Sequence, residues 1–199
     1  SLRINNDLNT GGGTIVATGG SLGGGGTVGG NLVNNGASIT PGNRAGTLRV
    51  MGDFSQTTGN TDIELFGSGN VAGTDYDRLA VDGIANLAGQ LNLLQDAQFN
   101  PTLLDTMTGI IEAETVSGTF DTINGSVISG QTGFAVTYTS QSVDITVALR
   151  GNTDVASGDM DVDTSDLTTS IINFTSAGGT GKTWADGDMD GDGDVDTSD

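Results

Sequence analysis

Short runs of aliphatic and β-branched residues, broken by glycine, asparagine, aspartate and threonine, recur through residues 1–149. Apolar and polar side chains alternate within these runs, so that Ile63 and Leu65 point to one face and the acidic residues beside them to the other. Because the intervening turns are too short for helices, the pattern predicts a mainly β fold. The expected strands are 14–16, 31–33, 47–50, 61–66, 78–81, 90–94, 134–139 and 143–149.

Glycine and proline usage narrows the architecture. The chain has 34 glycines and 2 prolines in 199 residues, and residues 1–59 repeat Gly-Gly-x-Leu and Gly-Thr-x-x motifs. This favours a β-solenoid, in which each rung buries a few aliphatic side chains and turns on glycine. A β-sandwich is the alternative, and it fits residues 60–149 better than residues 1–59.

The net charge limits the possible partners. The chain carries a charge of −19, it has no His and no Cys, and 12 of its 25 acids follow Arg150, where Lys182 is the only base. Such a chain is repelled by phosphates and by anionic membrane surfaces, so nucleic acid is not an expected partner. No stretch is long and apolar enough to span a bilayer as a helix.

The last twelve residues place acids at positions 1, 3, 5, 9 and 12 of a loop, with Gly193 at position 6. This is the spacing of an EF-hand calcium loop, in which oxygen ligands converge on a hard cation around a sharp glycine turn. Position 7 ligates through its backbone carbonyl, and position 12 is Asp instead of the usual Glu. The predicted calcium ligands are Asp188, Asp190, Asp192, Asp194, Asp196 and Asp199.

A solvated acidic tail is the alternative interpretation of this segment. Against it, the hexapeptide Asp-Val-Asp-Thr-Ser-Asp occurs twice, at 161–166 and 194–199, and Val195 sits where such loops pair with a neighbouring loop. The first copy lacks a Gly-Asp-Gly-Asp tetrapeptide, and Asp154 adds a ligand only through a bulge. The weaker candidate ligands there are Asp159, Asp161, Asp163 and Asp166.

The two copies resemble a type I dockerin, a calcium-dependent module by which secreted bacterial proteins dock onto cohesin domains. The resemblance covers about a quarter of the chain, residues 150–199. It implies a Ca²⁺-binding module with a cohesin-like protein partner. In that family loop positions 10 and 11 carry much of the partner recognition, and the matching residues are Thr164, Ser165, Thr197 and Ser198.

Between the copies, Asp166 is expected to cap a helix that continues to about Phe174 with one apolar face. In a dockerin a second helix covers that face; here the chain stops before it, so Trp184 or the preceding domain is expected to do so. Residues 176–183 superficially match a phosphate loop, but they lack the first glycine and a preceding strand, so a glycine-rich linker is the better interpretation.

Residues 1–149 carry a second resemblance. Gly26-Thr-Val-Gly-Gly-Asn-Leu-Val-Asn-Asn-Gly36, Gly52-Asp-Phe-Ser-Gln56 and Asp75-Tyr-Asp-Arg-Leu-Ala-Val81 look like the end of an autotransporter-type passenger β-solenoid. The resemblance implies a secreted structural or adhesive role and brings no catalytic residues. Since the chain opens on Ser1, we expect a fragment of a longer protein.

Paired acids at i, i+2 are the only hint of catalysis: Asp62 with Glu64, Asp75 with Asp77, and Glu112 with Glu114. Such pairs are the minimum for glycoside hydrolysis but are ordinary on the solvent face of a strand, and no His or Cys accompanies them. We therefore expect no enzyme activity in this fragment.

Two functions remain open. The first is a non-catalytic extracellular or cell-surface module, in which calcium orders a docking tail on a β-rich stalk. The second is the C-terminal accessory region of a secreted polysaccharide-degrading enzyme whose catalytic domain lies upstream. Millimolar calcium outside the cell suits the predicted loop in either case.

Overall fold

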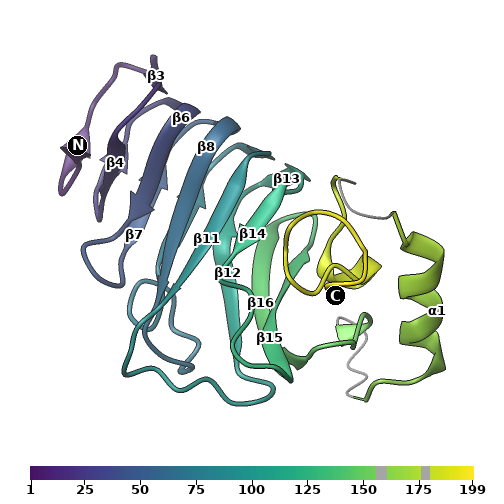
Figure 1. The fold of residues 1–199 in the computed structure, drawn as a ribbon. Coiled ribbons are helices and arrows are strands. Elements are labelled where there is room, and N and C mark those ends of the chain that lie inside the picture. Colours follow the sequence, from purple (N-terminus) through teal and green to yellow (C-terminus); the bar gives the residue numbers. More distant parts are fainter. Residues whose placement is uncertain (156–160, 176–179) are drawn as a thin grey trace.

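The computed structural model describes residues 1–155, 161–175 and 180–199, and its strands form two sheets that face each other (Figure 1). The nine-stranded sheet contains β1 (Leu2–Arg3), β3 (Thr14–Ala17), β4 (Ser21–Gly24), β6 (Asn31–Pro41), β8 (Phe54–Leu65), β10 (Ile84–Leu87), β11 (Gln90–Gln95), β13 (Thr115–Gly118) and β14 (Thr122–Asn124). The seven-stranded sheet contains β2 (Asp7–Leu8), β5 (Thr27–Val28), β7 (Thr47–Val50), β9 (Arg78–Val81), β12 (Thr106–Glu112), β15 (Thr132–Tyr138) and β16 (Ser142–Leu149).

The chain passes back and forth between the two sheets, and successive passes pair in parallel. In the seven-stranded sheet, β2, β5, β7, β9 and β12 lie side by side in sequence order. The pairs β12–β16 and β15–β16 are antiparallel and finish that sheet. Every expected strand overlaps an observed one, so the prediction of a mainly β fold is confirmed.

The core lies between the two sheets and follows the predicted alternation. On β8, Ile63 and Leu65 are fully buried while Asp62 and Glu64 are partly exposed. The largest fully buried side chains come from both sheets and include Leu32, Leu48, Phe54, Tyr76, Leu79, Leu91 and Met107. Inward-facing apolar side chains from neighbouring passes therefore form one continuous cluster.

Two glycines show how closely neighbouring passes stack. Gly118 is the last residue of β13 and has a φ of +76°, and Gly125 directly follows β14 and has a φ of +79°. A Cβ at these positions would lie 2.5 Å and 2.3 Å from the carbonyl oxygens of Leu87 and Leu93. Both positions therefore require glycine, for the turn and for the close contact.

A buried polar network around Gln56 joins neighbouring strands of residues 1–149, which are called the β stack below. The side chain of Gln56 accepts hydrogen bonds from Asn34 Nδ2 (3.0 Å) and Thr61 Oγ1 (2.8 Å). Its amide nitrogen donates to the carbonyl oxygens of Ala88 (2.8 Å) and Gln90 (3.0 Å). Because Gln56 is only 2% exposed, this network replaces water for the groups it joins.

Beyond β16 the chain forms α1 (Thr164–Asn173), the 3₁₀ turn η2 (Trp184–Asp186) and a loop that ends at Asp199. Figure 1 shows the loop at the end of the β stack, with α1 farther out. Among the described residues, no helix is long and apolar enough to cross a membrane.

The expectations for the helix need two corrections. Asp163, not Asp166, is the N-cap, because its carboxylate accepts the backbone N–H of Ser165; Asp166 lies three residues into the helix. Trp184 does not cover the apolar face of α1. It is buried in a separate cluster, and Ile171 and Ile172 on α1 are 65% and 75% exposed.

Candidate metal site

The terminal loop is built around the carboxylate of Asp188. Its Oδ1 accepts the N–H of Gly191 (2.6 Å) and its Oδ2 the N–H of Gly193 (2.9 Å). The two glycines have φ of +84° and +93°, a conformation that side chains other than glycine rarely adopt. The loop therefore wraps around the first predicted ligand, as the sequence spacing requires.

The six predicted second-copy ligands fall into two groups of three. In each group one carboxylate oxygen per residue lies within 4.8 Å of the others. One group contains Asp188, Asp190 and Asp192, and the other contains Asp194, Asp196 and Asp199. The carboxylate of Asp194 also belongs to a group, and ligation through its backbone carbonyl stays a prediction.

Asp199 connects the two groups. Its Oδ1 accepts the N–H groups of Met189 (2.6 Å) and Asp190 (3.3 Å), and its Oδ2 accepts that of Asp196 (2.7 Å). The last residue of the loop is thereby held against the first residues. Oxygen donors gathered at this density can hold a hard divalent cation, and the donor set contains no sulfur or imidazole that would favour a softer metal.

Burial, with a smaller contribution from neighbouring carboxylates, raises the pKa of Asp188. Burial raises the pKa of Asp188 to about 7, and the carboxylates of Asp199 and Asp190 add to the shift against two backbone hydrogen bonds. A backbone N–H lowers the pKa of Asp192, but burial and neighbouring carboxylates outweigh it and the pKa is raised. Without a cation the loop thus holds buried and closely spaced carboxylates, whose ionised forms a divalent ion would stabilise.

The first copy of the hexapeptide is used differently. Asp163 and Asp166 form a capping box at the start of α1, and Asp166 Oδ1 also accepts the N–H (2.7 Å) and Oγ1 (3.0 Å) of Thr153. Asp161 is exposed, and Asp159 lies outside the described residues. Within the described ranges the first-copy acids form no group of metal-ligand geometry, so the structure brings together only the second set.

Both copies nevertheless fold their shared Asp-Thr-Ser-Asp segment in the same way. Asp163 Oδ1 accepts the N–H (2.6 Å) and Oγ (2.7 Å) of Ser165, and Asp196 Oδ1 makes the same two contacts with Ser198 at 2.7 Å each. These contacts, with the side-chain bond from serine largest, lower the pKa of Asp163 and Asp196. The spacing of an N-cap acid and an acid three residues later is a sequence signal for this arrangement that the ligand interpretation overlooked.

Within the described residues, Val195 and its counterpart Val162 do not show the expected pairing of the two loops. The backbone N–H of Val195 donates to Thr175 Oγ1 (3.1 Å) and its carbonyl accepts the N–H of Thr175 (2.9 Å). Val162, the equivalent residue of the first copy, is 51% exposed. The two copies differ before their shared segment, because the first lacks the Gly-Asp-Gly-Asp tetrapeptide that supplies Gly191 and Gly193 to the second loop. Part of the expected linker, 176–179, lies outside the described residues.

The candidate recognition residues are all exposed. Thr164 and Ser165 are the first two residues of α1, and Thr197 and Ser198 lie at the end of the metal loop. The hydroxyl of Ser198 is bonded to Asp196, so the conformation of this residue depends on a predicted ligand.

Two members of the acid pairs, Asp77 and Asp62, have structural partners. Asp77 is 1% exposed and accepts the N–H groups of Gly46 and Glu64, both at 3.0 Å; burial raises its pKa to about 8. Asp62 accepts hydrogen bonds from Ser38, Asn60 and Asn92. Each acid thus joins neighbouring strands or loops.

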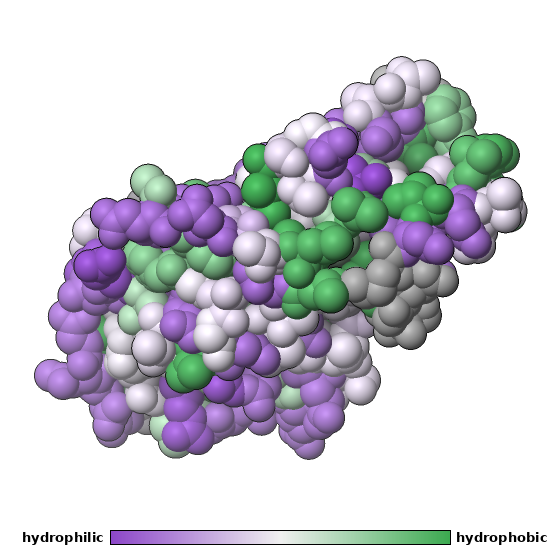
Figure 2. All heavy atoms as spheres, turned by 90° about the horizontal axis from the view of Figure 1, so that it is seen from below, coloured by the Kyte–Doolittle hydropathy of each residue, from purple (hydrophilic) through white to green (hydrophobic). Residues whose placement is uncertain are grey.

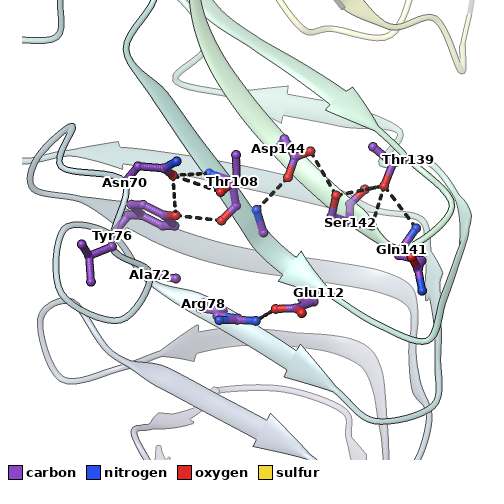
Figure 3. Close-up of a pocket in the computed structure, with 12 residues that line it drawn as sticks. Asn70, Ala72, Tyr76, Arg78, Thr108, Glu112, Thr139, Gln141, Ser142 and Asp144 are labelled. Atoms are coloured by element: carbon purple, nitrogen blue, oxygen red, sulfur yellow. Dashed lines mark hydrogen bonds and ion pairs between the residues drawn. The ribbon is translucent and has the colours of Figure 1, made fainter.

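A polar hollow of about 650 Å³ opens on the outer side of the seven-stranded sheet (Figure 3). Arg78 forms an ion pair with Glu112 at one side, and at the other Ser142 Oγ donates to Asp144 (3.0 Å). Tyr76 donates from its hydroxyl to the carbonyl oxygen of Thr108 (2.7 Å). The ring of Tyr76 is buried and offers no stacking face.

The terminal loop is therefore the best-formed candidate site among the described residues. Comparison with models of known protein families and with curated proteins finds no match for this chain.

Proposed function

We propose that residues 150–199 form a dockerin-like module that binds calcium and docks onto a protein partner. The observation that carries the proposal is the assembly of six carboxylates into two groups of three, which Asp199 joins by hydrogen bonds. All donors are oxygens, and their sequence spacing is that of an EF-hand loop. Calcium would be held by these acids and would offset their repulsion, which couples ion binding to ordering of the tail.

Exposed apolar side chains support the docking role. Leu167, Ile171 and Ile172 on α1, and Phe174 just after it, are between 52% and 75% exposed. Figure 2 shows apolar surface gathered toward the tail end of the molecule, whereas the surface of the β stack in that view is largely hydrophilic. A cluster of exposed apolar side chains next to polar ones is typical of a protein-interaction surface. It adjoins Thr164 and Ser165, the residues that the dockerin resemblance assigns to recognition of a cohesin-like domain.

The β-rich part suits a stalk. We propose that residues 1–149 form a β-solenoid, in which each pass of the chain through the two sheets is one rung. Successive passes stack in sequence order, with glycines at the closest approaches. The whole is then a secreted or cell-surface structural or adhesive segment that displays a calcium-ordered docking tail. Catalysis is not part of this function.

The proposal is tested by calorimetric titration of calcium into matched double variants. Asp188→Ala with Asp190→Ala removes two predicted ligands and is expected to abolish tight calcium binding. Asp161→Ala with Asp163→Ala removes the same number of charges from the first copy and is expected to leave tight calcium binding intact. Equal binding by both variants would sink the assignment.

The docking role has its own test. Immobilised cohesin domains are presented with the full chain in calcium and in excess chelator, and binding is expected only in calcium. The double variant Leu167→Asp with Ile171→Asp, whose replaced side chains are exposed, is expected to lose binding while keeping calcium affinity. Retained binding by this variant would remove α1 from the docking face.

A further inference from the structure

The metal loop lies against the end of the β stack. In the nine-stranded sheet, β14 pairs on one side with β11. On β14, the N–H of Ile123 donates to the carbonyl oxygen of Gly191 at 2.7 Å, and just beyond this strand Ser126 Oγ donates to that of Asp190 at 3.0 Å. Two carbonyls from the middle of the metal loop therefore accept hydrogen bonds from the last turn of the stack.

The fit between the two surfaces is close. A Cβ on Gly191 would lie 2.2 Å from the carbonyl oxygen of Ile123, and one on Gly193 would lie 2.5 Å from that of Asp121. Both distances are far below van der Waals contact, so only glycine allows the loop to approach the strand this closely. The same two glycines donate to Asp188, which ties the shape of the contact surface to the predicted ion site.

An apolar anchor completes the contact. Met189, which follows the first predicted ligand, is 2% exposed and packs with Trp184 against Ala135 of β15 and Ala148 of β16. The indole Nε1 of Trp184 donates to the carbonyl oxygen of Asn152 at 2.6 Å. The loop is thus fastened to both sheets, by hydrogen bonds to one and by apolar packing to the other.

We propose that loop 188–199 is a calcium-dependent cap on the end of the β stack, an inference that rests on the proposed calcium site. A stack of parallel strands needs its terminal edge covered, because an open edge is a template for pairing with another chain. The two carbonyls that make the contact belong to Asp190, which is a predicted ligand, and to Gly191, which lies between the predicted ligands Asp190 and Asp192. Calcium fixes the path of the backbone between its ligands, and therefore fixes the position of both carbonyls.

Linkage makes the proposal testable from the side of the stack. If calcium favours the capped state, then weakening the cap weakens calcium binding, by at most the factor by which the cap itself is weakened. Ser126 belongs to the β stack, and its hydroxyl donates to the backbone carbonyl of Asp190 in the loop. Ser126→Ala therefore removes a cap contact and no predicted ligand. The loss of one hydrogen bond is expected to weaken calcium affinity about fivefold. Ser129→Ala is the control, since the hydroxyl of Ser129 bonds only within its own turn.

The experiment combines calcium calorimetry on the full chain and these two variants with hydrogen exchange at the Ile123 amide. Calcium is expected to slow exchange at Ile123 at least tenfold, and Ser126→Ala is expected to bind calcium more weakly than Ser129→Ala. If calcium binds but neither the exchange rate nor the Ser126→Ala affinity responds, the cap is overturned and the calcium site stands. If no calcium binds and Ile123 is protected without it, both the cap's calcium dependence and the proposed calcium site are overturned.

Discussion

Calcium affinity should fall steeply below neutral pH because of Asp188. This acid is 3% exposed, it lies near Asp190 and Asp199, and its pKa in the ion-free loop is raised to about 7. Calcium requires the ionised form, so each pH unit below this value costs about 1.4 kcal/mol and lowers the apparent affinity about tenfold. From pH 7 to pH 5 the expected loss is about 50-fold, because the acid is already half protonated at pH 7, whereas an Asp at its ordinary pKa of 3.8 would cost less than about a factor of two.

The assay is calorimetric titration at pH 8, 7, 6 and 5 in two buffers with different heats of ionisation. About one proton should be released per bound calcium at pH 6, and almost none at pH 8. Asp188→Asn keeps the shape of the side chain without its titration, so its weaker affinity should be nearly independent of pH between 8 and 6. An unchanged wild-type affinity across this range, without proton release, would refute the reasoning.

The ion-free tail should show the opposite dependence. A folded pKa raised above 3.8 means that the stability contributed by neutral Asp188 is fully present below pH 3.8 and is lost as pH rises through about 7. In chelator, the tail is therefore expected to be better ordered at pH 5 than at pH 8. The fluorescence of Trp184, the only tryptophan, reports this through its burial against the stack. Greater exposure of the indole at pH 5 than at pH 8 would contradict the assignment.

Three further predictions concern single residues. Asp163→Ala removes the N-cap of α1 and should destabilise the helix by about 1 kcal/mol, seen as a lower helical signal in circular dichroism; an unchanged signal would mean that the cap is dispensable. Gln56→Leu leaves several buried polar groups without partners and should lower the free energy of unfolding by about 2–4 kcal/mol in denaturant titration, whereas a loss under about 1 kcal/mol would indicate that water enters the network. Ile172→Asp replaces a side chain that is 75% exposed, so the melting temperature should stay within about 2 °C, and a larger drop would show that α1 is covered in solution.

The strands were largely predictable because alternation is a local property. The segments that escaped detection contain glycine or depend on distant partners. Gly109, with φ of +66°, lies inside β12 at a register shift and hides that strand in the sequence. Gly36 and Gly59 similarly interrupt the apolar pattern within β6 and β8, so these strands are longer than expected. A glycine that breaks a pattern in sequence here marks a bend within a strand.

The candidate site was predictable only in part. Ligand spacing is a local property, and the structure gathers the second-copy acids that the spacing selected. The position of the loop depends on contacts that no local pattern encodes, such as Ser126 with Asp190 across 64 residues. The role of Trp184 was misassigned for the same reason, since the sequence does not reveal that Ala135 and Ala148 provide its packing surface.

The most direct test of the account is the stoichiometry of calcium binding by the full chain, measured by calorimetry with the two-dimensional NMR spectrum followed in parallel. The account predicts one tight site, with new dispersed amide signals from residues 188–199 appearing in proportion to the bound ion. Absence of calcium binding, or binding that leaves those signals unchanged, would contradict the claim that the acidic loop is an ion-ordered docking element.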